Sequence, residues 1–389
     1  MSLCKHRFIN VGIFFLVVSF AARCHALSIT AGPYLQNPSE TSMTIMWMTD
    51  AKCTSWVEYG TGDTLDQKAI AAQHGLIDAN QTIHRITISG LTAGRQYKYR
   101  ICSREIIELL HWRVTYGETV TSDVKTFTTL SRQKQNISFI VLNDIHQDDS
   151  LMVSLLEMSA SRPYDLVFLN GDILGHIQDE PQIVNHVLKP CSRVFASHTP
   201  FIWVRGNHET RGAFARMLPN YITLSEGRYY GSFDHGPVHF LVMDGGEDKN
   251  DDHREYSGLA AFDPYREEQT VWLRSEIKTD AFRNARFRVV LVHMPPLPME
   301  RWHGPTDLHN KWRPLFNEGK VDLVISAHTH AYTVMKPQEG LRDYPMVIGG
   351  GNRRGQATVI RVDATPDKLD VVMTRDDGEI VGRYSIDAK

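Results

Sequence analysis

The sequence predicts two successive domains, an all-β sandwich followed by a layered α/β domain. Residues 27–130 form short runs of β-forming residues separated by turn residues, and no helical pattern of useful length competes with them. Residues 137–389 begin with strongly apolar runs that alternate with helical stretches. Residues 131–136 contain no apolar side chain, and we take this segment as the linker between the two domains.

The sandwich strands are expected where β-formers run without Gly or Pro or alternate with polar residues, at 42–49, 55–59, 82–88, 96–101 and 123–128. In the second domain, runs that are almost entirely apolar predict strands that are buried on both faces. These runs lie at 137–142, 165–169, 201–204, 238–243, 287–292 and 321–325. Helices are expected at 149–161, from its apolar spacing, and at 265–282, after the helix entry Asp263-Pro264. The chain then returns to strands, at 346–348, 357–362, 369–373 and 379–386.

The first 26 residues have the pattern of a secretory signal peptide. Lys5 and Arg7 are followed by the apolar run 11–22, and Ala26 is a small residue suited to a cleavage site. The run is short for a membrane span, which needs roughly 20 residues. We therefore expect an exported protein (periplasmic, cell-surface or extracellular) that is not stably inserted in a membrane.

Composition narrows the choice of partners and cofactors. The formal net charge of the 389 residues is −3, and no block of like charges suggests a nucleic-acid-binding surface. Removal of the signal would leave Cys53, Cys102 and Cys191. Cys53 and Cys102 could pair in an exported protein, but the odd count favours no dependence on disulfides. The absence of a CxxC pair argues against a cysteine-based zinc site.

Polar side chains follow the ends of five of the apolar strands. In an open α/β sheet, ligands bind outside the carboxyl ends of the strands. A single histidine at such a place is more often structural than a ligand, but five successive occurrences favour a metal site. Asp, Asn and His together suit Mn, Fe or Zn better than Ca or Mg. The residues are Asp144, His146, Asp172, Asn207, His208, Glu209, His293, His328 and His330.

These blocks resemble the signature of the calcineurin-like metallophosphoesterase family in order and spacing. The blocks are Asp144-x-His146, Gly171-Asp172, Gly206-Asn207-His208-Glu209, His293 and His328-x-His330. The front domain, with Gly32-Pro33-Tyr34 and the segment 91–99, resembles the fibronectin type III-like domain that precedes the catalytic domain of purple acid phosphatases. The resemblance implies a four-layer α/β/β/α sandwich as the second domain.

The resemblance also implies a ligand set and a mechanism. One metal would be held by Asp144, His146, Asp172 and His330, and a second by Asp172, Asn207, His293 and His328, with Asp172 bridging. A metal-bound hydroxide would attack phosphorus, and His208 would stabilise charge or protonate the leaving oxygen. Two positions depart from the purple enzymes. Gly175 stands where those enzymes carry the tyrosine that colours Fe(III), and His146 stands where they lack a histidine.

Substrate contacts are predicted at Asn207, Arg211 and His303. Arg211 closely follows the third block and could reach a phosphate, although a solvated surface arginine is equally compatible. His303 lies in the expected loop 294–307, which could line the cleft. The predicted function is a phosphoesterase acting on small phosphorylated molecules, with monoesters favoured. The alternatives are a phosphodiesterase or nucleotide hydrolase on the same site, or a non-catalytic metal-binding or adhesion protein.

Overall fold

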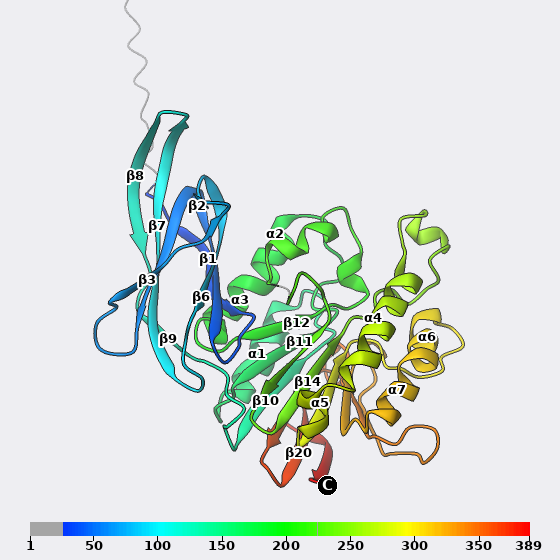
Figure 1. Cartoon of the computed structure of the whole chain (residues 1–389). Coiled ribbons are helices and arrows are strands. Elements are labelled where there is room, and N and C mark those ends of the chain that lie inside the picture. Colours follow the sequence, from blue (N-terminus) through cyan, green and yellow to red (C-terminus); the bar gives the residue numbers. More distant parts are fainter. Residues whose placement is uncertain (1–25, 224) are drawn as a thin grey trace, which may run out of the picture.

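The computed structural model describes residues 26–223 and 225–389, and shows a β-sandwich beside a larger α/β part (Figure 1). The predicted signal peptide, apart from Ala26, lies outside the described residues. Among the residues described, no helix is long and apolar enough to cross a membrane.

The front sandwich is built on two long strands, β2 and β7. The strands are β1 (Ile29–Gln36), β2 (Ser42–Gly60), β3 (Gln67–Ala69), β4 (Ala72–Gln73), β5 (Leu76–Ile77), β6 (Gln81–Ser89), β7 (Gln96–Leu110), β8 (Arg113–Thr121) and β9 (Lys125–Thr128). The first half of β2 pairs with β1 and β6, and its second half pairs with β3 and β7. Trp47 and Val57, from the two halves, share one core with Tyr97, Tyr99 and Phe127, as a sandwich requires.

Strand β2 joins two strands that were expected to be separate, at 42–49 and 55–59. That prediction was wrong at residues 50–54, where the chain stays extended while it changes partners. Asp50 and Lys52 are exposed there, so the apolar signal is interrupted although the strand is not. Several sandwich strands were not predicted, among them β1, which contains Gly32-Pro33, and β8, an edge strand with exposed polar residues.

The α/β part contains two six-stranded sheets that face each other, with strand orders β12-β11-β10-β19-β20-β21 and β13-β14-β15-β16-β18-β17. Neighbours among β10, β11 and β12 are parallel, as are neighbours among β14, β15, β16 and β18. Phe139 and Phe168 of the first sheet meet Phe240 of the second in the core between them.

Most strands of these sheets lie close to their predicted positions, but the two edge strands of the second sheet, at 231–235 and 333–335, were not predicted. In the first sheet they are β10 (Ile137–Leu142), β11 (Leu166–Asn170), β12 (Phe201–Val204), β19 (Thr358–Ala364), β20 (Lys368–Arg375) and β21 (Ile380–Asp387). In the second they are β13 (Gly231–His235), β14 (Val238–Met243), β15 (Phe287–Val292), β16 (Leu323–Ser326), β17 (Thr333–Met335) and β18 (Met346–Ile348).

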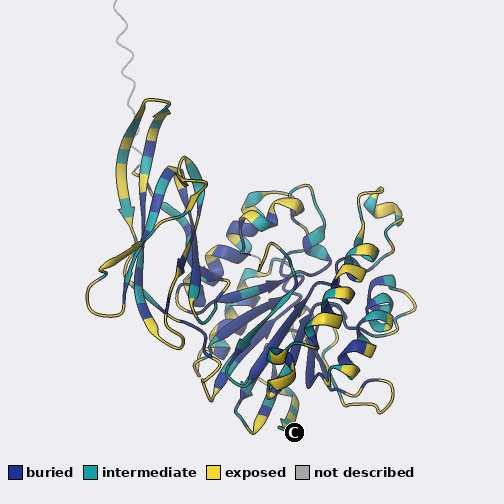
Figure 2. Cartoon of the chain, in the orientation of Figure 1, coloured by how far each residue is buried: buried dark blue, intermediate teal, exposed yellow. Residues whose placement is uncertain are grey.

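Helices cover the outer face of each sheet, and the expected four-layer α/β/β/α order is confirmed. The first sheet is covered by α1 (Asp149–Ser159), α2 (Glu180–Ile183) and α3 (Lys189–Cys191), with helical turns completing 180–196. The second is covered by α4 (Phe262–Glu276), α5 (Asp280–Asn284), α6 (His303–Lys311) and α7 (Arg313–Glu318). Figure 2 shows the strands as the buried interior and the exposed residues on the outer sides of helices and on loops.

The helices of this part differ from the prediction in two ways: the single helix expected at 265–282 is divided into α4 and α5, and both α4 and α6 begin where no helix was expected, with a proline in the first turn. Helix α4 begins at Phe262, so Pro264 lies in its first turn, where proline is tolerated. The Asp251 side chain accepts hydrogen bonds from the backbone N–H groups of Phe262 and Asp263 (2.7 and 3.0 Å) and so caps this end. Similarly, the expected loop 294–307 is replaced from His303 onward by α6, with Pro305 in its first turn.

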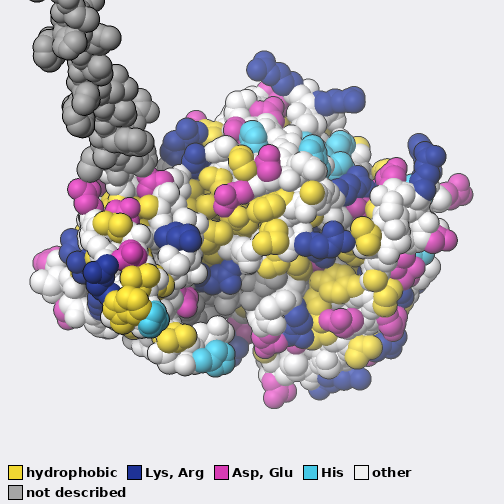
Figure 3. Space-filling model, turned by 90° about the horizontal axis from the view of Figure 1, so that it is seen from above, with side chains coloured by type: hydrophobic (Ala, Val, Ile, Leu, Met, Phe, Trp, Pro, Cys, Tyr) yellow, Lys and Arg dark blue, Asp and Glu magenta, His cyan; other side chains and the backbone are white. Residues whose placement is uncertain are grey.

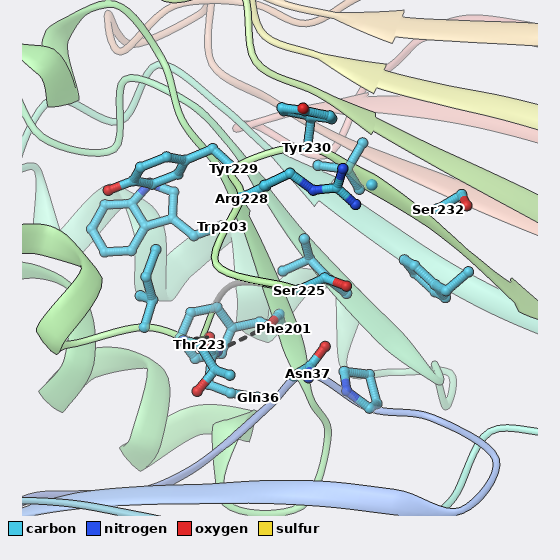
Figure 4. Close-up of a pocket in the computed structure, with 16 residues that line it drawn as sticks. Gln36, Asn37, Phe201, Trp203, Thr223, Ser225, Arg228, Tyr229, Tyr230 and Ser232 are labelled. Atoms are coloured by element: carbon cyan, nitrogen blue, oxygen red, sulfur yellow. Dashed lines mark hydrogen bonds between the residues drawn. The ribbon is translucent and has the colours of Figure 1, made fainter. Parts of the chain in front are cut away.

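The sandwich packs directly on the α/β part. Tyr34 belongs to the core of the first sheet and its helices. A small cavity of about 80 Å³ lies at the junction, between the edge strands β12 and β13, lined by Gln36, Phe201, Trp203 and Tyr229 (Figure 4). Its volume is far below the roughly 300 Å³ of small ligand sites. Cys53, Cys102 and Cys191 are buried free thiols, so no disulfide links them.

Candidate metal centre

The polar residues that follow the parallel strands meet at one end of the two sheets. Asp144 and His146 follow β10, Asp172 follows β11, and His293 follows β15. The structure forms two groups of possible metal ligands whose donor atoms lie within 4.8 Å of one another. The first group is Asp144, His146, Asp172 and His330, and the second is Asp172, His293 and His328. Asp172 belongs to both, so the two groups adjoin.

Distances within the groups are short enough for shared ions. In the first group, Nε2 of His330 lies 3.4 Å from Asp144 Oδ1 and 3.1 Å from His146 Nε2. In the second, Nε2 of His293 lies 3.2 Å from Asp172 Oδ2. The Asn207 amide oxygen lies 3.0 Å from Nδ1 of His328, which brings Asn207 to the second group.

The backbone of these loops is held in an unusual conformation. Non-glycine residues seldom adopt positive φ, and such strain gathers at functional sites. Backbone hydrogen bonds hold the turns, including those from Asp144 N–H to Gly171 O and from His146 N–H to Asp172 O, both 3.0 Å. The left-handed residues include Asp144 (φ 49°), His146 (48°), Asp172 (52°), His328 (71°) and His330 (57°).

The glycines of two sequence blocks are required by close packing. A Cβ at Gly171 would collide with the ring of His293, and one at Gly206 would collide with the Asp172 carboxylate. Gly171 and Gly206 therefore allow the ends of β11, β12 and β15 to approach one another. No other residue type would fit without moving a candidate ligand.

The buried donors fit metal ions well. Asp144 Oδ1 and the Nε2 atoms of His293 and His328 are buried and have no hydrogen-bond partner among the described residues. Buried polar atoms are normally paired, so three of them converging on one place are suited to cations. Burial lowers the pKa of His328, which keeps its ring neutral. His293 donates its Nδ1–H to Asn170 O (2.9 Å), which directs Nε2 toward Asp172.

His208 adjoins the two groups without belonging to either. Its Nδ1–H donates to Gly175 O (2.6 Å), and its backbone N–H donates to Asp172 Oδ1 (3.0 Å). These bonds orient Nε2, which lies 3.9 Å from Asp172 Oδ2. The ring is partly exposed, as are those of His146 and His330. Histidine side chains gather on the face seen in Figure 3, near several Lys and Arg side chains.

Glu209 stabilises the loops from behind the site. Its carboxylate is fully buried and accepts backbone N–H groups of Asp172 (2.9 Å), Leu174 (3.0 Å) and Gly206 (2.8 Å). Burial, together with the nearby charge of Asp172, raises the pKa of Glu209. Glu209 therefore supports the loops through hydrogen bonds to their backbone.

Arg211 lies beside His208, and its guanidinium forms ion pairs with two acidic side chains. It makes a two-point pair with Glu247 (2.8 and 2.9 Å) and a contact with Asp248 (3.1 Å). Its Nη1 lies 3.4 Å from His208 Nε2. The two acids, buried and some 36 residues further along the chain, were not singled out from the sequence.

His303 pairs with an acid that belongs to neither of the two ligand groups. Its Nε2 lies 2.7 Å from Asp263 in a third acidic group that also includes Asp307. The buried Arg266 guanidinium pairs with both acids, so this group already holds a cation. The neighbouring Trp302 instead packs edge-on against His328, with ring centroids 4.6 Å apart. The sequence had placed both residues in one loop and could not show which of them faces the site.

Asp244 is a buried carboxylate that is held by hydrogen bonds. Its carboxylate pairs with Arg205 (2.6 Å) and accepts the Tyr265 hydroxyl (3.1 Å). Asn143, which the sequence analysis did not consider, donates to Asp144 Oδ2 (2.8 Å) and to Gly350 O (2.8 Å), and so fixes the first carboxylate.

Comparisons with known proteins agree with this geometry. Residues 137–332 match the family model of the calcineurin-like phosphoesterases, and residues 32–129 match that of the purple acid phosphatase N-terminal domain. Acid phosphatase type 7 of Mus musculus is 25 % identical over 86 % of this chain and 77 % of its own length. Purple acid phosphatase 22 of Arabidopsis thaliana is 23 % identical over 82 % of this chain and 70 % of its own.

Solved structures show the same fold. A purple acid phosphatase from yellow lupin seeds superposes with a TM-score of 0.69 at 15 % identity, covering 91 % of this chain and 74 % of its own. PhoD superposes with a TM-score of 0.66 at 11 % identity, covering 92 % of each chain.

Family and geometry together settle the class of protein. The expected cofactor, a pair of transition-metal ions, is confirmed by the family and by the two adjoining donor groups, whereas the choice among Mn, Fe and Zn stays a prediction. The chain belongs to the calcineurin-like phosphoesterase family, and it is a metal-dependent phosphoric ester hydrolase with a front domain of the purple acid phosphatase type.

Proposed function

We propose that this chain is an exported phosphomonoesterase with a dinuclear metal centre. The observation that carries the proposal is the sharing of Asp172 between two adjoining donor groups, with His208 beside them. The preference for monoesters rests on relatives that are named acid phosphatases. Export rests on the basic and apolar pattern of residues 1–26.

The proposed first site comprises Asp144, His146, Asp172 and His330. The proposed second site comprises Asp172, Asn207, His293 and His328. Once bound, the metals would supply Lewis-acid stabilisation of the phosphate oxygens and a water of lowered pKa as the nucleophile. Asp172 would hold the two sites at a fixed separation, and the Asn207 amide would also contact the substrate phosphate.

His208 is the proposed proton donor to the leaving oxygen. Its Nδ1–H bond to Gly175 O directs Nε2 toward the reacting group. In this structure Nε2 accepts only a long hydrogen bond, from Arg211 Nη1 (3.4 Å), and a proton that replaces this contact could pass from Nε2 to the departing alkoxide. The short contacts of Arg211 to Glu247 and Asp248 support a positioning role for Arg211, because its charge is already compensated. Of the proposed substrate contacts, His303 is supported least, since it pairs with Asp263.

The test uses the mature full-length chain after metal removal. Mn, Zn or Fe is added back separately, and hydrolysis of p-nitrophenyl phosphate and bis-p-nitrophenyl phosphate is measured together with metal content. His208→Ala should lower kcat by about 10²–10⁴-fold with metal content unchanged. Asp172→Asn should lower both activity and metal content. His111→Ala, an exposed histidine on the front sandwich, is the matched control and should match the wild type.

The outcomes separate the alternatives. A higher kcat/KM for the monoester supports the proposal, and a higher value for the diester would make the chain a phosphodiesterase. If two metals bind but neither ester is hydrolysed, the proposed activity is wrong and the non-catalytic alternative gains. If activity persists unchanged in both site variants, the proposed roles are wrong.

A further inference from the structure

A large open groove lies directly beside His208. It has a volume of about 750 Å³ and is lined, among others, by Thr210, Arg211, Arg216, Tyr256, Leu259 and Phe262. We refer to it as the Arg216 groove. Its size is that of a typical small-molecule site. Arg211 forms the wall between the groove and the metal centre, because the same guanidinium lies 3.4 Å from His208 Nε2.

The groove carries one uncompensated positive charge. Arg205 pairs with Asp244, and Arg211 pairs with Glu247. Glu255, the other acid of the lining, pairs with Lys249 (3.2 Å). Among the described residues, Arg216 has no acidic partner within ion-pair distance. Its one hydrogen bond is a long one, 3.4 Å, to the Leu259 carbonyl oxygen.

The remaining walls are largely apolar or aromatic. Leu259 is 73 % exposed and lies on the loop before α4. Tyr256 and Phe262 also line the groove and are only partly buried. Tyr256 donates its hydroxyl to Glu247 (2.7 Å), which fixes its ring in the wall. Such surfaces suit the flat or apolar body of a small ligand.

We infer that the Arg216 groove binds the leaving-group portion of the substrate. The favoured substrates are phosphate esters whose alcohol has an aromatic or apolar body and a second anionic group, which Arg216 contacts. This inference rests on the proposed function, since it places the scissile phosphate at the metal centre and the leaving oxygen at His208. The alcohol then continues past Arg211 into the groove, where Arg216 offers a positive charge that no acid among the described residues compensates.

The test compares matched substrates that differ in one charge. The probes are 4-(ω-carboxyalkyl)phenyl phosphates of increasing chain length and the methyl ester of each. The full-length, metal-loaded enzyme and its Arg216→Ala, Arg216→Lys and Arg254→Ala variants are assayed for kcat and KM. Arg254 is an exposed arginine in the same loop as Leu259 but outside the lining, so it is the matched control.

For the wild type we expect KM for one or more carboxylates to be about tenfold below that of the methyl ester, with kcat similar. Arg216→Ala should abolish this preference by raising KM for the carboxylates alone, Arg216→Lys should restore part of it, and Arg254→Ala should keep it. The inference is overturned if no chain length shows a preference, or if Arg216→Ala and Arg254→Ala act alike. Failure of the proposed function is distinct, because then no member of either series is hydrolysed.

Discussion

Replacing Glu209 by Gln should destabilise the metal-site loops although the two side chains have the same shape. The Glu209 carboxylate accepts three backbone N–H groups, two at Oε2 and one at Oε1. Gln has a single acceptor oxygen, and its amide nitrogen would face at least one of these N–H groups. A buried donor left without an acceptor costs about 1–3 kcal/mol, and the loss of a charged acceptor puts the cost near the upper end.

The expected loss of about 2–3 kcal/mol corresponds to a fall in Tm of roughly 4–12 °C for a domain of this size. Calorimetry of the metal-stripped protein at pH 8.5 measures this fall. The pH is chosen because burial raises the pKa of Glu209 and the carboxylate must be ionised for the comparison. Metal content after loading should fall as well, because the bonds to Asp172 and Gly206 position the shared carboxylate.

The control is Glu267→Gln on α4, where the side chain is 57 % exposed and its one ion pair, with Lys311, is 3.8 Å long. This variant should keep the wild-type Tm within about 1 °C, as exposed ion pairs contribute little. If Glu209→Gln keeps both the Tm and the metal content of the wild type, Glu209 does not hold the loops in the way described.

Four further outcomes are expected. Burial lowers the pKa of His84 to about 4, whereas the pKa in the unfolded chain is about 6.5. The stability that the neutral ring contributes is therefore fully present above pH 6.5 and is lost as the pH falls toward 4. The total loss is about 3 kcal/mol. Urea unfolding followed by near-ultraviolet circular dichroism measures this loss, and His84→Gln should make the midpoint less dependent on pH; the ring of Trp47, one of the seven tryptophans, lies 5.2 Å from that of His84. Chelation should lower Tm, and added metal should raise it with concentration, because ions that bind only the folded state stabilise it; a Tm unaffected by metal would contradict the site. Trp302→Ala should weaken binding of one metal about tenfold through loss of packing on His328, whereas equal titration curves would show that this ring has no such effect. The iron-loaded enzyme should lack a tyrosinate charge-transfer band in its visible spectrum, because position 175 is Gly; a strong purple band would show another tyrosine at the metal.

The strand ends of the candidate site could be predicted because two independent signals coincide in the sequence. Apolar runs such as 137–142 mark strands buried on both faces, and buried parallel strands place their carboxyl ends together. The residue types that follow then define the chemistry. Gly171 and Gly206 add a third signal, since each is the small residue that lets neighbouring strand ends approach.

The direction of individual side chains could not be predicted in the same way. Arg211 and His303 are fixed by Glu247 and Asp263, which lie 36 and 40 residues away in the chain. No periodicity connects such pairs, because the contacts depend on how separate loops pack. The same holds for Trp302, whose role becomes visible only through its contact with the ring of His328.

The front sandwich contacts the segment that forms one wall of the Arg216 groove. Arg85 of β6 donates to the carbonyl oxygens of Pro219 (2.6 Å) and Ile222 (2.9 Å), and the Tyr34 hydroxyl donates to Tyr221 O (2.7 Å). Pro219 lines the Arg216 groove, three residues after Arg216 itself. Since these three carbonyl groups are held by side chains of the sandwich, the position of the groove wall depends on how the sandwich is docked. The sandwich therefore contributes to the geometry in which Arg216 meets a leaving group, although it supplies none of the candidate metal ligands.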